Sequence, residues 1–341
     1  MMFLVRTVMY FFLLILFLLS LSAIYTAWRV QQISERFEPD GSIAEIDGVD
    51  LHYHFTPGRD PDPERPVLVF LHGASGNSYD TRLAFEGAFS GRYPLLFIDR
   101  PGLGFSERSF ARDSSLEGQA RLVGGLLKHL EIERAIVVGH SYGAAVTAVL
   151  GLIEPDRVAG LAFIAPVSHP WPGGVDLYYR IAALPVVGPL FTRTVTLPLA
   201  ERLAPAAILR VFAPGEAPEG YAEAINLPLL FRPRSFRANS ADIAFLKEDV
   251  TRHSASYHEL DQPAVIITGT DDTVVWPSIH SEGLLRDLPN AELVVLSNGG
   301  HMPHHTHKSD VVEALEKLVD RIESTSRKEG DRGKVASKIA S

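Results

Sequence analysis

The stretch "AIVVGHSYGAAVTAVLGL", residues 135–152, decides how the rest of the chain is interpreted. Its first four residues are apolar and mostly β-branched, which is typical of a buried strand, whereas the residues after Gly143 favour a helix. Between them stands G-x-S-x-G, with Gly139 and Gly143 on either side of Ser141. Glycine removes the side chains that a sharp strand-to-helix turn could not accommodate. The pattern therefore predicts a serine nucleophile at such a turn.

Apolar runs and helical patterns alternate on both sides of this stretch. The sequence around Asp47-Gly48, from 42 to 55, predicts a β-hairpin because Asp-Gly favours a two-residue turn. Further apolar runs bounded by turn residues are found at 66–73, 94–102, 158–166, 264–269 and 291–296. Such runs, separated by amphipathic segments, indicate buried parallel strands with crossover helices. A last helix is predicted at 309–322, with Ser309 as its N-cap.

One long segment interrupts this alternation. Nearly 100 residues separate Pro166 from Ala264, which is too long for a loop in a compact domain. Helical patterns broken by proline fill the segment, so we predict an inserted helical subdomain. The chain is thus divided into a transmembrane anchor or uncleaved signal at 1–28, a polar stalk at 29–41, a first core segment at 42–167, a helical cap at 168–262, a second core segment at 263–324 and a polar, disordered tail at 325–341.

Composition excludes several classes of function. The chain has 341 residues, carries a formal charge of -9 and has no basic stripe along which a nucleic-acid backbone could lie. We therefore expect no nucleic-acid partner. The absence of cysteine excludes thiolate nucleophiles, zinc-cysteine sites and disulfides, but it fits a cytosolic and a periplasmic protein equally well.

The N-terminus contains 22 residues without a charge, from Thr7 to Trp28. As a helix this run would span roughly 33 Å, against a hydrocarbon core of about 30 Å. A cleaved signal peptide is the alternative, because "SLSA" (20–23) offers small residues. We favour a retained single-pass anchor in the lipid bilayer. The flanking charges are too evenly balanced to fix its orientation, and the expected location is a bacterial inner membrane with the catalytic domain outside the cytoplasm.

Five motifs, in order along the chain, resemble the α/β-hydrolase family, in the cap-bearing branch that includes epoxide hydrolases, haloalkane dehalogenases and ring-cleavage-product hydrolases. They are "LHGASGNS" (71–78), "DRPGLGFSE" (99–107), "GHSYGAA" (139–145), "GTDDTVVWP" (269–277) and "GGHMPHH" (299–305). The resemblance covers about residues 42–322. It implies an α/β class fold with a mostly parallel eight-stranded sheet, helices on both faces and an inserted helical cap.

The resemblance also implies a catalytic triad of Ser141, Asp272 and His301, in the chain order that this fold uses. The family's G-x-x-D motif, starting at Gly269, selects Asp272 over the adjacent Asp271. Asp271 would then be a loop residue.

Two backbone N–H groups are implied as the oxyanion hole, those of Ala74 and Tyr142. One departure from the family pattern follows the acid, where Trp276 takes the place of the usual proline and Pro277 comes next. This puts the shape of that loop in doubt, but not the choice of the acid.

A serine at the elbow argues against epoxide hydrolase and dehalogenase activity, because those enzymes attack with a carboxylate. We expect a serine hydrolase that cleaves carboxylic esters of small hydrophobic substrates without a cofactor. The alternatives are carbon-carbon bond hydrolysis of diketone-type ring-cleavage products and a membrane-tethered binding protein without turnover. Candidate substrate-binding residues in the apolar cap are Trp171, Tyr178, Tyr179 and Phe191, for which packing between cap and core is an equal explanation.

Four histidines gather at residues 301–307, namely His301, His304, His305 and His307. A metal site would need two or three of them to converge from one rigid element, as in the helical spacing H-E-x-x-H. Two glycines precede the cluster and Pro303 interrupts it, so we predict one catalytic base, His301, and no metal. The other three are interpreted as residues of the helix approach or the pocket rim.

Overall fold

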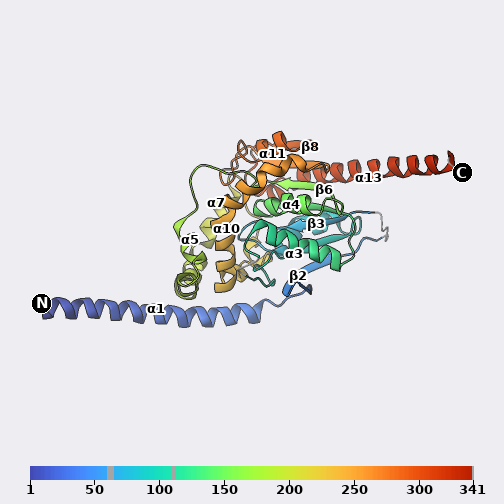
Figure 1. The fold of residues 1–341 in the computed structure, drawn as a ribbon. Helices are drawn as coiled ribbons and strands as arrows, with labels where there is room; N and C mark the ends of the chain where they lie inside the picture. Colours follow the sequence, from blue (N-terminus) through green and yellow to red (C-terminus); the bar gives the residue numbers. More distant parts are fainter. Residues whose placement is uncertain (60–64, 110–112, 340–341) are drawn as a thin grey trace.

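A single eight-stranded sheet forms the centre of the molecule in the computed structural model, which describes residues 1–59, 65–109 and 113–339 (Figure 1). Its strands are β1 (Ser42–Ile46), β2 (Val49–Thr56), β3 (Val67–Leu71), β4 (Leu95–Ile98), β5 (Ala135–His140), β6 (Val158–Ile164), β7 (Ala264–Gly269) and β8 (Ala291–Leu296). They lie in the order β1-β2-β4-β3-β5-β6-β7-β8. Only the pairings of β2 with β1 and with β4 are antiparallel. The predicted fold class is confirmed.

Helices cover both faces of this sheet because the apolar strands have two faces to bury. One face packs on α3 (Leu116–His129), α4 (Tyr142–Ile153) and α11 (Ser281–Asp287). The other packs on α2 (Ser78–Phe89) and the first part of α13 (Lys308–Ile339). β5 lies between β3 and β6, so its carboxyl end opens at the middle of the sheet.

A run of helices separates β6 from β7, where the sequence predicted an inserted cap. It contains α5 (Leu177–Ala183), α6 (Val187–Phe191), the π-helical turn η1 (Thr192–Thr196), α7 (Leu197–Phe212), α8 (Tyr221–Ala224), α9 (Pro228–Phe231), α10 (Pro233–His253) and the 3-10 segment η2 (Ser254–Glu259). Helix α10 joins this layer to the core, since buried Asp242 forms ion pairs with Arg100 and Arg108 at 2.8 and 2.6 Å.

The N-terminal helix α1 (Met2–Arg36) is longer than predicted. The residues expected to form a stalk are helical as far as Arg36, because Ile33 and Phe37 pack with Leu197, Leu229 and Phe231 of the cap layer. Within the described residues, α1 is the one unbroken helix long and apolar enough to cross a membrane, a test that signal sequences also pass.

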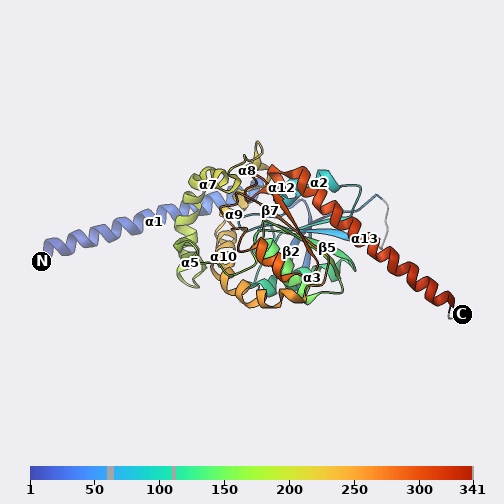
Figure 2. The ribbon, with the colours of Figure 1, turned by 90° about the horizontal axis from the view of Figure 1, so that it is seen from above.

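The C-terminal helix also differs from the prediction. Helix α13 continues through the segment expected to be disordered and ends at Ile339, although only its backbone is described from residue 326 onward. Extending a packed helix needs no new nucleation, which favours continuation into a polar sequence without proline. Helices α1 and α13 leave the body at opposite ends (Figures 1 and 2).

Candidate active site

Ser141 lies at the turn between β5 and α4, with φ 51° and ψ -112°. A non-glycine residue at positive φ costs on the order of 1–3 kcal/mol and persists where packing enforces it. That packing is tight on both sides of the serine. A Cβ atom at Gly139 would come within 2.3 Å of the Thr147 hydroxyl oxygen, and one at Gly143 within 2.3 Å of the Leu71 carbonyl oxygen. The two glycines thus let helix and strands approach closely enough to hold the turn.

Three of the residues predicted from sequence form a continuous hydrogen-bond chain. The Ser141 hydroxyl lies 3.0 Å from His301 Nε2, and His301 Nδ1 lies 2.8 Å from Asp272 Oδ2. Because the carboxylate accepts the Nδ1–H, Nε2 is left with a lone pair that can accept the serine proton. All three residues are buried, at 7%, 4% and 4% exposure for Ser141, His301 and Asp272.

The loop after β7 explains why Asp272, and not Asp271, meets the histidine. A Cβ at Gly269 would come within 2.1 Å of the Gly299 carbonyl oxygen, so the acid and histidine loops touch through their glycines. The second Asp272 oxygen accepts the backbone N–H groups of residues 274 and 275, both at 2.8 Å. Asp271 is exposed, and within the described residues its carboxylate accepts a hydrogen bond only from the Thr270 hydroxyl, at 3.4 Å.

The loop carrying Ala74 passes beside the serine. A Cβ on Gly73 would lie 3.3 Å from the Ser141 Cβ. Tyr142 is the first residue of α4, whose N–H has no partner within the helix. Within the described residues, neither the Ala74 N–H nor the Tyr142 N–H donates a hydrogen bond. Both N–H groups are thus free to donate to another acceptor.

The side chains of this region hold the loop in place. Arg100 is fully buried, and its Nε–H donates to the His72 carbonyl oxygen at 2.9 Å. Its guanidinium also lies 4.2 Å from the centre of the Tyr142 ring, whose hydroxyl accepts from Gln119. The ring and hydroxyl of Tyr142 are therefore occupied by Arg100 and Gln119.

Comparison with known proteins decides the family. The family model described as the alpha/beta hydrolase fold matches residues 66–308. The chain belongs to the α/β-hydrolase fold family. It is therefore a hydrolase of this fold.

Individual relatives of this hydrolase differ in the reactions that their names state. It is 28% identical over 276 residues to the sn-1-specific diacylglycerol lipase ABHD11 of Mus musculus, covering 80% of this chain and 86% of that protein. It is 27% identical over 267 residues to the 2-hydroxy-6-oxononadienedioate/2-hydroxy-6-oxononatrienedioate hydrolase of Paraburkholderia phymatum, covering 76% and 88%. The solved enol-lactonase of Burkholderia xenovorans is similar in fold, with a TM-score of 0.65, 20% identity and coverage of 82% and 100%.

Two of the remaining histidines of the hydrolase's 301–307 cluster, His304 and His305, contact an aspartate that sequence reasoning missed. Asp80 of α2 is buried and lies 2.8 Å from His305 Nε2 and 3.4 Å from His304 Nε2. The Tyr221 hydroxyl of the cap donates to the same carboxylate at 2.8 Å. Burial alone would raise the pKa of Asp80, but the hydrogen bonds from His304 and His305 keep that pKa well below its usual value. No spacing in the sequence pointed to Asp80, because these partners lie more than 140 residues away.

These contacts correct the rim interpretation for two of the histidines. The His305 side chain is directed into the protein and is 3% exposed, and His304 is fully buried. His140 lies beside His304 and donates from Nε2 to the His301 carbonyl oxygen at 2.9 Å. Burial and the two neighbouring histidines keep the pKa of His140 well below its usual value, so its ring is neutral. His140, His304 and Asp80 therefore support the loop that carries His301.

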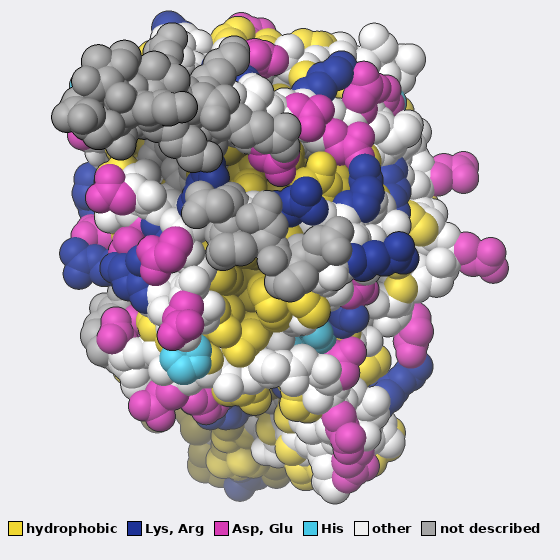
Figure 3. Space-filling view, turned by 90° about the vertical axis from the view of Figure 1, so that its right-hand side faces the viewer, with side chains coloured by type: hydrophobic (Ala, Val, Ile, Leu, Met, Phe, Trp, Pro, Cys, Tyr) yellow, Lys and Arg dark blue, Asp and Glu magenta, His cyan; other side chains and the backbone are white. Residues whose placement is uncertain are grey.

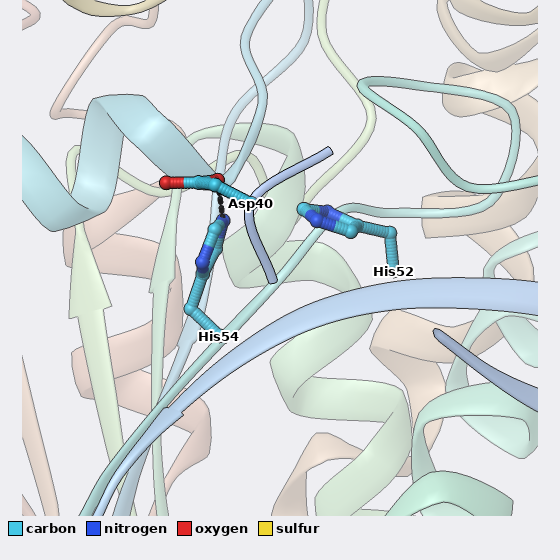
Figure 4. A group of neighbouring side chains, drawn as sticks. All are labelled: Asp40, His52 and His54. Atoms are coloured by element: carbon cyan, nitrogen blue, oxygen red, sulfur yellow. Dashed lines mark ion pairs between the residues drawn. The ribbon is translucent and has the colours of Figure 1, made fainter. Parts of the chain in front are cut away.

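A second group of acid and histidine residues lies near the hairpin (Figure 4). The figure shows Asp40 pointing at His54, with 3.5 Å between the Asp40 carboxylate and His54 Nε2, and His52 beside them. The ring centres of His52 and His54 lie 4.7 Å apart. His52 Nδ1 donates to Asp99 at 2.7 Å, and the Arg82 guanidinium lies 3.1 Å from His54 Nδ1. A cation held this close to His54 opposes a metal ion at the same place. The group fits a hydrogen-bonded network better than a metal site.

The four cap residues predicted to bind substrate have different surroundings in the structure. Trp171 packs its ring at 5.9 Å from His280, and the rings of Tyr178 and Tyr179 lie 4.1 Å from each other. Phe191 is half-buried at the end of α6. Their role in binding stays a prediction. Sequence reasoning missed an apolar group next to His301. In this group Phe212, Tyr221 and Ile225 of the cap layer pack with Met302, the residue after His301.

Proposed function

We propose that the hydrolase is a serine esterase that cleaves carboxylic ester bonds of small hydrophobic substrates. The observation that carries this proposal is the chain of hydrogen bonds from Ser141 through His301 to Asp272 at a strained turn. Such a chain turns a weak hydroxyl nucleophile into an active one, since the imidazole can remove its proton during attack.

In this mechanism Ser141 Oγ attacks the ester carbonyl carbon while His301 Nε2 takes the hydroxyl proton. Asp272 stabilises the imidazolium that forms. The carbonyl oxygen becomes negatively charged and accepts hydrogen bonds from the backbone N–H groups of Ala74 and Tyr142. Each of these hydrogen bonds lowers the activation barrier by about 3–4 kcal/mol. His301 then protonates the leaving alcohol as the C–O bond breaks. A water molecule, deprotonated by His301, hydrolyses the acyl-enzyme and restores Ser141.

The surroundings of the cap arginines favour esters over ring-cleavage products. Cleavage of a diketone-type acid calls for a basic residue that binds the substrate carboxylate, and the cap layer offers Arg180, Arg210, Arg232 and Arg234. Arg234 pairs with Glu107 at 2.8 Å, and Arg232 donates to the Gly104 carbonyl oxygen. Arg180 and Arg210 are exposed on the outside of the cap. Within the described structure, none of these four arginines is therefore both buried and unengaged, as binding of a substrate carboxylate would require.

A substrate panel tests this proposal. Full-length protein in detergent is given p-nitrophenyl esters of increasing acyl length beside a diketone-type ring-cleavage product, with Ser141→Ala as the matched control. We expect ester hydrolysis well above the control and no diketone cleavage. Diketone cleavage without ester hydrolysis would overturn the assignment, and turnover of neither substrate class would count against any esterase function.

We also propose that α1 is retained as a membrane anchor. The Ser22 hydroxyl donates to the Thr194 carbonyl oxygen, and Glu201 accepts from Tyr25 at 2.8 Å and from Arg29 Nε at 2.9 Å. These contacts use the part of α1 that includes and follows the small residues of a signal-type cleavage region, so cleavage there would interrupt a docked helix. Carbonate-washed bacterial membranes should contain protein of full-length mass. A soluble product that begins just after Ala23 would refute retention.

A further inference from the structure

The outer side of the cap, at α5, α6 and α7, has an unusual concentration of exposed apolar side chains. After Arg36, the described residues include eighteen large hydrophobic side chains that are exposed, and nine of them fall between residues 177 and 209. These nine are Leu177, Tyr178, Leu184, Val186, Val187, Leu190, Leu199, Leu203 and Leu209. We call them the cap face. Apolar surface of this extent on a soluble domain marks an interaction site.

The cap face is continuous with the apolar part of α1. A groove of about 540 Å³ lies between the two, and its walls are mostly hydrocarbon. Its lining residues are Ile15, Leu18, Leu19 and Ser22 of α1 and Thr194, Val195, Pro198, Leu199 and Arg202 of the cap. Figures 1 and 2 show α5 and α7 at the end of the body from which the N-terminal half of α1 projects. If α1 crosses a bilayer, the cap is therefore the part of the body that lies nearest to the bilayer.

The positions of the contacts set how deep the cap would lie. Ile15 and Ser22 are the first and last residues of α1 that line the groove against the cap, and seven residues of helix correspond to ~10 Å along its axis. Interfacial helices lie about 5–10 Å deep in the boundary between headgroups and acyl chains. The 20 residues before Ser22, from Met2 to Leu21, span about 30 Å, which is enough to cross the hydrocarbon core.

The charge of this region also fits a membrane surface. Residues 177–212 contain four arginines (Arg180, Arg193, Arg202 and Arg210) and one acid (Glu201), a difference of +3 in a chain of net charge -9. Glu201 is already paired with Arg29 of α1. The arginines are exposed among the apolar side chains, where they can attract anionic lipid headgroups. The opposite end of the molecule carries charges of both signs around an apolar area (Figure 3).

We propose that the cap face is a second membrane-binding surface, embedded in the headgroup region of a bilayer beside α1. The occupant of the groove is then the acyl chain of a bilayer lipid. This proposal rests on α1 as an anchor and extends it, because the cap that covers Ser141 would itself contact lipid. Hydrophobic esters dissolved in the bilayer would reach the enzyme from the membrane side rather than from water.

Single-cysteine labelling tests the proposal in the full-length protein, because the natural chain has no cysteine. Leu190→Cys and Leu203→Cys place an environment-sensitive fluorophore on the cap face, where the natural side chains are 63% and 51% exposed. Val295→Cys on β8, at 54% exposure, is the matched control far from α1, and Phe12→Cys reports on the anchor. Each labelled protein is reconstituted into phosphatidylcholine-phosphatidylglycerol vesicles with and without lipids that carry a doxyl quencher.

The expected result is strong quenching at Phe12, Leu190 and Leu203 and none at Val295. Quenching at Phe12 together with an unquenched label at either cap position would overturn the cap proposal and leave the anchor intact. Absence of quenching at all four positions would overturn both. Because the readout is fluorescence, neither result depends on esterase activity. Circular dichroism of each variant checks that it is folded.

Discussion

At the scale of single residues, the site depends on small differences in position between chemically identical groups. Asp271 and Asp272 are neighbours, yet only Asp272 reaches His301, because the glycine contact between residues 269 and 299 sets where the loop turns. The G-x-x-D spacing predicted this choice from sequence. The displaced proline did not alter it, since Asp272 accepts two backbone N–H groups within its own loop.

Asp272→Asn should therefore separate the two carboxylates functionally. An amide would present an N–H to His301 Nδ1 and favour the wrong imidazole tautomer, and the corresponding change in serine-protease triads costs about 10⁴-fold in kcat. We expect a loss of this order in ester hydrolysis. Asp271→Asn, the matched control, should stay close to wild type in steady-state kinetics. Equal losses in the two variants would contradict the assignment of the acid.

Asp80 shows what sequence could not supply at this scale. Its partners come from α12 (Pro303–Thr306) and from the cap, so only the tertiary fold brings them together. The histidine-rich stretch was correctly divided into one residue at the serine and several elsewhere. The contact of His304 and His305 with Asp80 was not predictable, because no pattern in the sequence around Asp80 marks it as a buried acid.

At the scale of elements, the apolar runs predicted the strands well, because a strand that is buried on both faces is itself a continuous apolar run in the sequence. The ends of the long helices were not predictable. Residues 29–36 have a polar composition, but Ile33 packs on cap residues nearly 200 positions away. Contacts of that range override local propensity.

The carboxylate of Asp80 connects three elements, since α2 carries it and α12 and α8 contact it. Asp80→Asn should reduce the free energy of unfolding by about 3 kcal/mol, because the hydrogen bonds from His304, His305 and Tyr221 lose their charged acceptor. Tyr221→Phe deletes only one hydrogen bond to the same carboxylate and should cost roughly 1.5 kcal/mol. Urea unfolding of the two variants checks the order. A Tyr221→Phe variant that is less stable than Asp80→Asn would refute the claim that the Asp80 carboxylate connects these elements.

At the scale of the whole molecule, buried histidines should make the fold sensitive to mild acid. Burial lowers the pKa of His54, His72, His280 and His304 to about 4, from 6.5 in the unfolded chain. Between these values the unfolded state binds more protons than the folded state, so stability falls as pH falls. The loss should begin near pH 6.5 and continue to about pH 4. Urea unfolding at pH 7.5 and pH 5 tests this, and equal stabilities would contradict the burial of neutral histidines.

The central claim for the whole molecule is that Ser141 is the activated nucleophile of a serine hydrolase. Reaction with a fluorophosphonate probe measures this most directly, because the probe forms a stable bond only with an activated serine. The account predicts labelling of the wild type at the peptide that contains Ser141, located by mass spectrometry, no labelling of Ser141→Ala and strongly reduced labelling of His301→Ala. A folded wild-type protein that fails to react, or a Ser141→Ala variant that reacts as well as wild type, would contradict it.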